Sequence, residues 1–279
     1  MKVSTTKTVK PWVIIMSSIV LLLSYTSLGA ELPTENDKPI PCRPTVSCNA
    51  DISVPGILEI EAGGLYHPDG PALSQFSMPF LAKLSTASWS QLQVGSNGYT
   101  VVQGSQPAYF FDDFTMGEKF HILDQKEYSP AFSFSGTLNI PASQNQSIYT
   151  RAYDAFFVAY VSKDVGSIHF DFNVGLNEWN IDTSSVPQQF AAFATSTNLN
   201  ANWGAVGELY AISDSNPIAA KDGGFRVAAS YSPRGWAVVD FGADLGFYPS
   251  IRSFSVFAGV TLVPAVLWRP KPIKVNSLF

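Results

Sequence analysis

Eleven charged or titratable residues stand at alternate positions within segments whose other positions are apolar. The acidic residues are Glu59, Glu61, Asp113, Asp171, Asp240 and Asp244, the basic ones are Lys83, Lys119 and Arg226, and the titratable ones are His121 and His169. Such side chains could line a water-filled path and select a solute by its charge. They could also pair with one another and fill the interior of a closed sheet. The residue types alone leave both roles open.

The segments that carry these residues have the two-residue period of β-strands. Along residues 168–175, one face is polar, and the other holds Ile168, Phe170, Phe172 and Val174. Nearly every strand repeats this pattern, and no helix is available to cover the apolar faces. The sequence therefore predicts an all-β fold, a transmembrane up-and-down antiparallel β-barrel with lipid outside and water inside.

We expect about twelve strands, an even number as in single-chain bacterial barrels. They span residues 57–66, 76–84, 89–95, 109–122, 131–140, 153–161, 167–176, 190–197, 203–212, 225–231, 236–247 and 253–263. Short connections alternate with longer ones, which is typical of outer-membrane barrels with short periplasmic turns. Both termini are therefore expected in the periplasm. The pattern leaves open which way the strands 153–161, 190–197 and 203–212 face.

Aromatic residues gather near the ends of the expected strands, as they do in interfacial girdles. At the short-turn end they are Trp89, Tyr128, Tyr160, Trp203 and Trp236. At the long-loop end they are Tyr66, Tyr109, Phe110, Trp179, Tyr210, Phe247 and Tyr248. Trp and Tyr are also common in strands of every kind, so these positions support the barrel without proving it.

The composition of the chain agrees with a membrane barrel. Charged residues make up 14% of the 279 residues, whereas soluble domains carry about 25%. The net charge of -5 gives no basic surface for nucleic acid. The partners we expect are outer-membrane lipid and a small-molecule solute, while the solute and the oligomeric state are left undetermined.

The chain divides into four parts. Residues 1–30 are expected to be a cleaved signal peptide, since lysines precede the apolar run 12–23 and small residues follow it. A membrane anchor is the alternative, but a spanning helix needs roughly 20 apolar residues. Residues 31–55 are expected to be an irregular periplasmic lead-in, 56–263 the barrel, and 264–279 a proline-rich tail.

Two cysteines, Cys42 and Cys48, lie in the lead-in. An oxidising compartment favours a disulfide between them. The alternative is a metal site, but two thiols without a nearby histidine make an incomplete set of zinc ligands. We expect the disulfide to fix the segment before the first strand, and we expect no metal.

Several runs of residues resemble a family of Gram-negative outer-membrane barrels labelled with the meta-pathway of phenol degradation, or simply as transporters. They are 43–45, 55–63, 92–98, 153–155, 159–164, 173–177, 222–224, 231–234 and 263–269. The resemblance covers most of the chain after residue 30. It implies a barrel and an outer-membrane location, but it implies little about the solute and supplies no catalytic residues.

An enzymatic function is not expected. Ser96, Asn97 and Gly98 resemble the serine segment of outer-membrane phospholipases, but Val94 stands where their histidine would be. A serine without a base within reach is not activated, and an Asn-Gly pair is typical of a turn. His121 and His169 are too isolated to indicate a triad, and no phosphate-binding loop indicates a nucleotide cofactor.

The sequence therefore favours an outer-membrane barrel that passively transports or admits a small solute, for example an aromatic or apolar one. One alternative is a structural or adhesive barrel with a plugged lumen. The other is a soluble periplasmic β-sandwich that binds a ligand.

Overall fold

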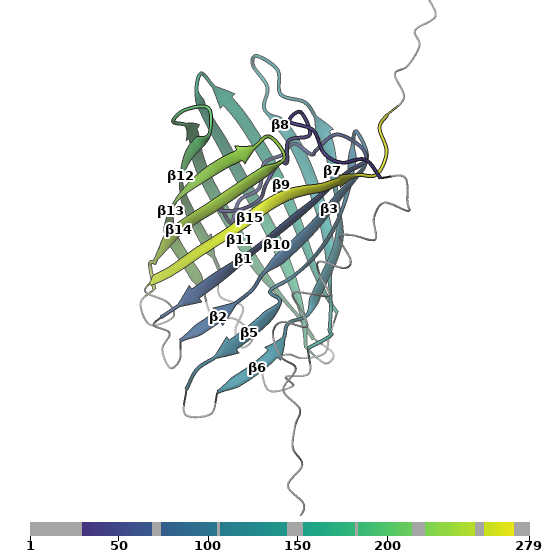
Figure 1. Ribbon diagram of the computed structural model, residues 1–279. Coiled ribbons are helices and arrows are strands. Elements are labelled where there is room, and N and C mark those ends of the chain that lie inside the picture. Colours follow the sequence, from purple (N-terminus) through teal and green to yellow (C-terminus); the bar gives the residue numbers. More distant parts are fainter. Residues whose placement is uncertain are drawn as a thin grey trace, which may run out of the picture.

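The computed structural model describes residues 30–68, 74–104, 107–143, 153–181, 184–213, 221–248 and 254–270, so the expected signal peptide lies almost entirely outside the described residues. Twelve strands close into one antiparallel barrel (Figure 1). In order around the wall they are β1 (Ile57–His67), β3 (Phe80–Ala87), β4 (Ser90–Ser96), β7 (Phe114–Leu123), β8 (Ala131–Ile140), β9 (Asp154–Val165), β10 (Ile168–Ile181), β11 (Ser184–Asn198), β12 (Trp203–Ile212), β13 (Asp222–Arg234), β14 (Ala237–Gly246) and β15 (Phe254–Val266). β15 pairs with β1 and completes the circle.

Strand pairing gives every strand one inward and one outward face. Glu59 pairs with Lys83, and Glu208 pairs with Arg226, which in turn pairs with Asp244. Because directly paired residues lie on the same face of a sheet, these charged side chains share one face. Among the described residues, the buried polar and charged side chains outnumber the buried apolar ones. The interior of this barrel is therefore polar.

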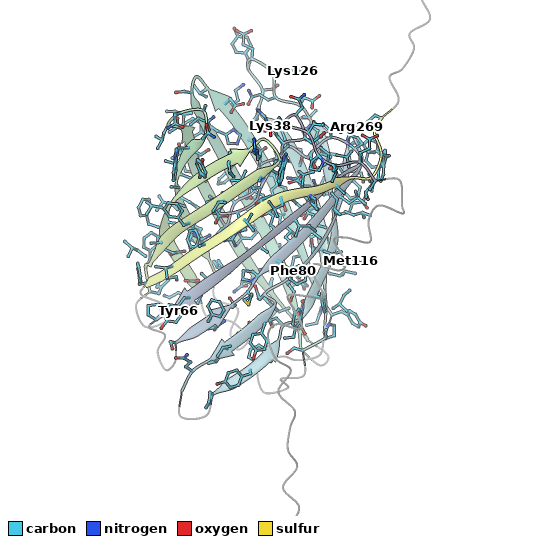
Figure 2. The ribbon with its side chains drawn as sticks, in the orientation of Figure 1. Lys38, Tyr66, Phe80, Met116, Lys126 and Arg269 are labelled. Atoms are coloured by element: carbon cyan, nitrogen blue, oxygen red, sulfur yellow. A yellow bond between two sulfur atoms is a disulfide. The ribbon has the colours of Figure 1, made fainter. Side chains whose placement is uncertain are left out.

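The opposite face of the wall is apolar and exposed. Leu138 is 54% exposed, Phe172 44% and Phe241 48%. Figure 2 shows such side chains along the outer wall, with Lys38, Lys126 and Arg269 at one end of the barrel. The predicted facing of the strands around Phe132, Phe170 and Phe241 is therefore confirmed, and a soluble sandwich with a shared apolar core is wrong. An apolar outer wall around a polar interior suits a lipid bilayer. No helix in the described ranges is long and apolar enough to span a membrane.

Three strands of the wall bend at one level and continue as a separate flap. The flap consists of β2 (Gln75–Ser77), β5 (Tyr99–Val102) and β6 (Ala108–Phe111). In Figure 1 it lies below the body of the barrel, where β2 pairs with the end of β1 and β5 pairs with β2. The sequence predicted one continuous strand across β2 and β3 and another across β6 and β7. It placed β5 in a loop.

Local chemistry explains the bends. Pro79 has no N–H for a strand ladder, so it interrupts the strand between β2 and β3. Gly98, between β4 and β5, has a φ of +67°, and a Cβ at this position would lie 2.1 Å from the carbonyl oxygen of Met78. Only glycine therefore fits this close approach of two bent strands.

The described termini and the short connections lie at the same end of the barrel. β9 and β10 are joined by Gly166 and Ser167, and β13 and β14 by Gly235 and Trp236. Glu31 bridges to Val266 at this end. The prediction that both termini lie on the short-turn side is therefore confirmed for the described residues. β15 runs through Pro264 to Val266, which was expected to lie in the tail, and the pairing of β1 with β15 shifts beside it.

Several aromatic residues expected in the girdles lie inside the wall instead. Tyr160 and Tyr210 are buried, at 6% and 5% exposure, and Trp179 shares the inward parity of Asn177. Trp236 packs against Ile57, Val263 and Val266. Trp89, Tyr128 and Tyr109 are exposed at the strand ends, as expected. For Tyr160, Trp179 and Tyr210, the sequence predicted a position in an outer girdle, whereas their side chains face inward.

Candidate functional site

Part of the lead-in, residues 40–51, lies within the short-turn end of the barrel, and we call it the lumenal segment. Its backbone is bound by side chains that point inward from the wall. The sequence predicted an irregular segment here and placed it in the periplasm, before the barrel; it is irregular, but this part fills the lumen. The difference has a physical cause, since buried carboxylates and lysines of the wall need partners and the lead-in supplies backbone N–H and C=O groups.

Lys83 and two glutamates of β1 hold the start of the lumenal segment. The Lys83 ammonium lies 3.1 Å from Glu59 and 2.7 Å from Glu61. Glu59 accepts a hydrogen bond from Ile40 N at 3.0 Å, and Glu61 accepts from Cys42 N and Arg43 N, each at 2.9 Å. One lysine neutralises only one of two buried carboxylates, so the amides stabilise the remaining charge.

Glu208 of β12 holds the middle of the segment. Its carboxylate is 1% exposed and accepts hydrogen bonds from Val46 N at 2.8 Å, Ser47 N at 2.7 Å and the Ser47 hydroxyl at 2.8 Å. Arg226 lies 4.0 Å away and donates to Pro44 O at 2.9 Å. The sequence did not single out Glu208, because Val206 and Tyr210 share its face and hide the alternation.

Arginines complete the charge balance of this region. Arg226 pairs with Asp244 at 2.9 Å, and the Tyr210 hydroxyl donates to the same carboxylate. Arg43 of the lead-in reaches Asp240 at 3.0 Å. Its guanidinium lies over Gly63 and Gly259, where a Cβ would come within 2.6 Å and 2.4 Å of it. The paired glycines therefore make room for the arginine.

The end of the lumenal segment is bound by β7, β9 and β10. Asn173 accepts a hydrogen bond from Cys48 N at 2.6 Å and donates to Cys48 O at 2.9 Å. Ala50 N donates to the Ser162 hydroxyl at 2.7 Å. The Lys119 ammonium donates to the carbonyls of Asn49 and Asp51. Asn173, Ser162 and Lys119 therefore all bind backbone groups of the lead-in.

The two histidines lie at the short-turn mouth. His169 contacts Asp164 at 2.7 Å and Asp171 at 3.0 Å, and Asn49 lies 3.1 Å from its Nε2 atom. His121 contacts Asp124 at 2.8 Å and Ala50 O at 3.2 Å. His121 also lies 3.2 Å from the Ser133 hydroxyl, but that hydroxyl is fully buried and donates to Ala50 O, so it is not placed as the nucleophile of a triad. His169 contacts no serine or cysteine within the described chain. Among the described residues, no group of His, Cys, Asp and Glu could hold a metal ion.

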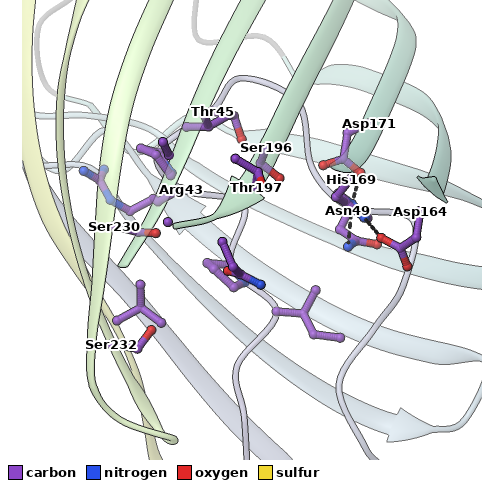
Figure 3. A pocket seen from close by; sticks show the side chains of 18 of the residues that line it. Arg43, Thr45, Asn49, Asp164, His169, Asp171, Ser196, Thr197, Ser230 and Ser232 are labelled. Carbon is purple, nitrogen blue, oxygen red and sulfur yellow. Dashed lines mark hydrogen bonds and ion pairs between the residues drawn. The ribbon is translucent and has the colours of Figure 1, made fainter. Parts of the chain in front are cut away.

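One cavity borders the lumenal segment, and a second borders the flap. The first has a volume of about 570 Å³ and separates the segment from the ends of β10 to β13. Figure 3 shows it, with Asn49, Asp164 and Asp171 joined to His169 by dashed lines. The second, of about 380 Å³, lies where the flap bends away, and Phe156, Trp179, Asp112 and Asp113 line it.

The structure brings most of the predicted site residues together around the lead-in. Ten of the eleven, Glu59, Glu61, Lys83, Lys119, His121, His169, Asp171, Arg226, Asp240 and Asp244, carry inward-facing side chains in the barrel strands. Asp113 lies apart from them at the base of the flap, where it accepts hydrogen bonds from Ala142 N and Ser143 N. Cys42 and Cys48 form a disulfide, as expected, within the lumenal segment.

The fold and this interior define a class, the closed β-barrel with an apolar outer wall. No family model matches the sequence, and no curated protein matches it. The fold is similar to that of the COG4313 outer membrane channel from Pseudomonas putida F1, with a TM-score of 0.54 and 12% identity over 75% of this chain and 96% of that one. This likeness shows the fold alone, so the family resemblance seen in the sequence stays a prediction.

Two further solved structures match with lower scores. The CymD monoaromatic hydrocarbon channel has a TM-score of 0.43 and 10% identity, over 75% of this chain and 89% of that one. The Pseudomonas putida toluene transporter TodX has a TM-score of 0.37 and 8% identity, over 77% of this chain and 90% of that one. Scores this low carry no argument about this chain.

Proposed function

We propose that this chain is a passive outer-membrane channel for a small solute, and that an aromatic or apolar solute fits it best. The observation that carries the proposal is a closed wall of twelve strands with apolar side chains outside and a polar interior. Such a barrel spans the outer membrane without an unpaired strand edge in lipid. The aromatic residues beside the second cavity support the choice of solute.

The predicted pore-lining residues have a specific place in this proposal. We infer that the residues around the lead-in, such as Lys83 and Arg226, act on the solute path indirectly by holding residues 40–51 in the lumen. The width of the path then depends on these contacts. Under this proposal both termini lie in the periplasm, on the short-turn side.

Planar bilayers and proteoliposomes test the channel. We expect the purified protein to give small conductance steps and to let benzyl alcohol enter proteoliposomes faster than protein-free vesicles. A protease tag after residue 270 should be cleaved only once the outer membrane is opened. The absence of both conductance and solute entry would contradict a channel.

A plugged structural barrel is the second candidate, and the lumenal segment itself favours it. Residues 40–51 are bound on several sides of the lumen, by β1, β10 and β12 among others. A structural barrel should admit no solute, even when a variant such as Glu208→Gln weakens the contacts of the segment. Solute entry that increases in this variant would instead favour a channel with a partial plug.

A further inference from the structure

The second cavity lies at the level where the wall divides. Its lining comes from the bent strands and from β8, β9 and β10 on the other side, and it includes Leu81, Asn139, Phe156 and Trp179. Its volume of about 380 Å³ lies within the range of small-molecule sites. It lies toward the long-loop end, away from the lumenal segment.

An aromatic pair forms one side of this cavity. The rings of Phe156 and Trp179 lie 5.4 Å apart at an angle of 64°. The Trp179 Nε1–H group donates to Gln188 at 3.0 Å, so the polar edge of the indole is already satisfied. The faces of such rings attract other aromatic rings and cations.

A buried carboxylate with an open oxygen lies in the same lining. Asp112 is 4% exposed, and its only side-chain hydrogen bond within the described chain comes from Thr100 to Oδ2 at 3.4 Å. Its Oδ1 atom has no hydrogen-bond partner there. Asp113 adds a second carboxylate, which Ala142 N, Ser143 N and Asn139 already bind. The lining described here contains no lysine, arginine or histidine.

The lysine that follows Leu81 on β3 does not offset these charges. Lys83 stands two positions beyond Leu81, but its ammonium is held by Glu59 and Glu61. A buried carboxylate without a cation favours a ligand that brings one.

We propose that this cavity binds an aromatic ammonium cation, with its ring against Phe156 and Trp179 and its charged nitrogen beside Asp112. The inference rests on the proposed channel and names the class of solute that it takes. The cavity is therefore expected to bind aromatic cations best, to bind neutral aromatic compounds more weakly and to exclude aromatic anions.

Probes with fixed charge test this order. Benzyltrimethylammonium, benzyl alcohol and benzenesulfonate share a ring and differ in charge, while tetramethylammonium has the charge without the ring. In titrations of the protein in a neutral detergent, we expect benzyltrimethylammonium to bind at least about fivefold more tightly than benzyl alcohol and tetramethylammonium. Benzenesulfonate should not bind measurably.

Single substitutions assign the effect to this cavity. Asp112→Asn should remove most of the preference for benzyltrimethylammonium and leave the binding of benzyl alcohol unchanged. Trp179→Leu should weaken both. Glu178→Gln is the matched control, because Glu178 is adjacent to Trp179 but lies on the outer face, where Ser185 donates to it. It should change neither affinity.

The outcomes separate this inference from the proposed function. Equal affinities for the cation and the neutral probe in the unmodified protein would overturn the inference, even if Asp112→Asn fails to fold. Solute entry into proteoliposomes with no preference for cations would leave the channel intact and refute the cation site. If neither solute entry nor probe binding is observed, both proposals are contradicted.

Discussion

The two ends of the lumen differ in how their charges are neutralised. At the short-turn end, the carboxylates of Glu61 and Glu208 each bind backbone amides of the lead-in, and Lys83 and Arg226 lie beside them. At the long-loop end, Asp112 has a weak contact with Thr100 and no cation in the cavity lining. Buried carboxylates therefore have two roles in this barrel. Carboxylates that are neutralised hold the lead-in in the lumen, and a carboxylate that is not neutralised can attract a cationic ligand.

Substitution of Lys83 should have the largest effect on stability. In Lys83→Met, Glu59 and Glu61 lose their shared cation, and breaking a buried ion pair costs roughly 3 to 5 kcal/mol. The temperature at which the folded band on unboiled gels converts to the unfolded band should fall. Lys163→Met is the matched control, since Lys163 faces outward and binds carbonyls at the exposed 126–129 turn.

A second substitution shows whether the lost stability comes from uncompensated charge. Adding Glu59→Gln to Lys83→Met removes one of the two unpaired carboxylates and should recover part of the stability. If the double variant is as unstable as the single one, lost packing rather than charge explains the effect, and the contrast between the two ends weakens.

Substitution of Glu208 should loosen the filled end of the lumen. Hydrogen bonds to charged groups contribute about 1.5 to 3 kcal/mol, so Glu208→Gln should destabilise the attachment of the lead-in by roughly 2 to 3 kcal/mol. We expect the conductance in planar bilayers to rise. Glu178→Gln, on the outer wall, should leave the conductance unchanged, and a rise in both variants would argue against release of the segment.

Opening the disulfide should have a smaller effect on the same segment. In the chain-entropy account, a crosslink between Cys42 and Cys48 stabilises the folded state by about 2 kcal/mol because its loop is short. The double variant Cys42→Ser, Cys48→Ser should therefore increase conductance less than Glu208→Gln does. A reductant should reproduce this change in the unmodified protein and have no effect on the double variant.

The contact between Asp37 and Arg269 should have the smallest effect. The Arg269 guanidinium donates to Asp37 at 2.9 Å and 3.0 Å, and this contact holds the pKa of that carboxyl well below its usual range. A lowered pKa means that the contact contributes stability above the pKa of the unfolded chain and loses it as the pH falls through the lower folded value.

Arg269→Gln measures this contribution. The variant should be slightly less stable than the unmodified protein between about pH 5 and about pH 8, with a constant difference, and the difference should shrink below about pH 4. A difference that grows toward alkaline pH would show that another group is involved.

The alternation of residue types was enough to predict the barrel. Strand β8 occupies residues 131–140 as expected, and the outward facing of Phe172 and Phe241 follows from the two-residue period alone. The flap could not be predicted, because the pattern continued one strand through Pro79 and placed Gly98 in a loop. Only the pairing of β2 with β1 and of β5 with β2 shows that these segments form a separate sheet edge. Glu208 was missed because Val206 and Tyr210 share its face, and its partners in the lead-in lie about 160 positions away.

The sequence by itself determined that the chain forms a closed antiparallel wall, which side of most strands is apolar, and that the termini share one end. It could do so because these properties depend on neighbours one or two residues apart. The tertiary structure decided that residues 40–51 enter the lumen, that Tyr160, Trp179 and Tyr210 face inward, and that Asp112 shares a cavity with an aromatic pair. Those properties depend on contacts between residues far apart in the chain, and no local pattern records them.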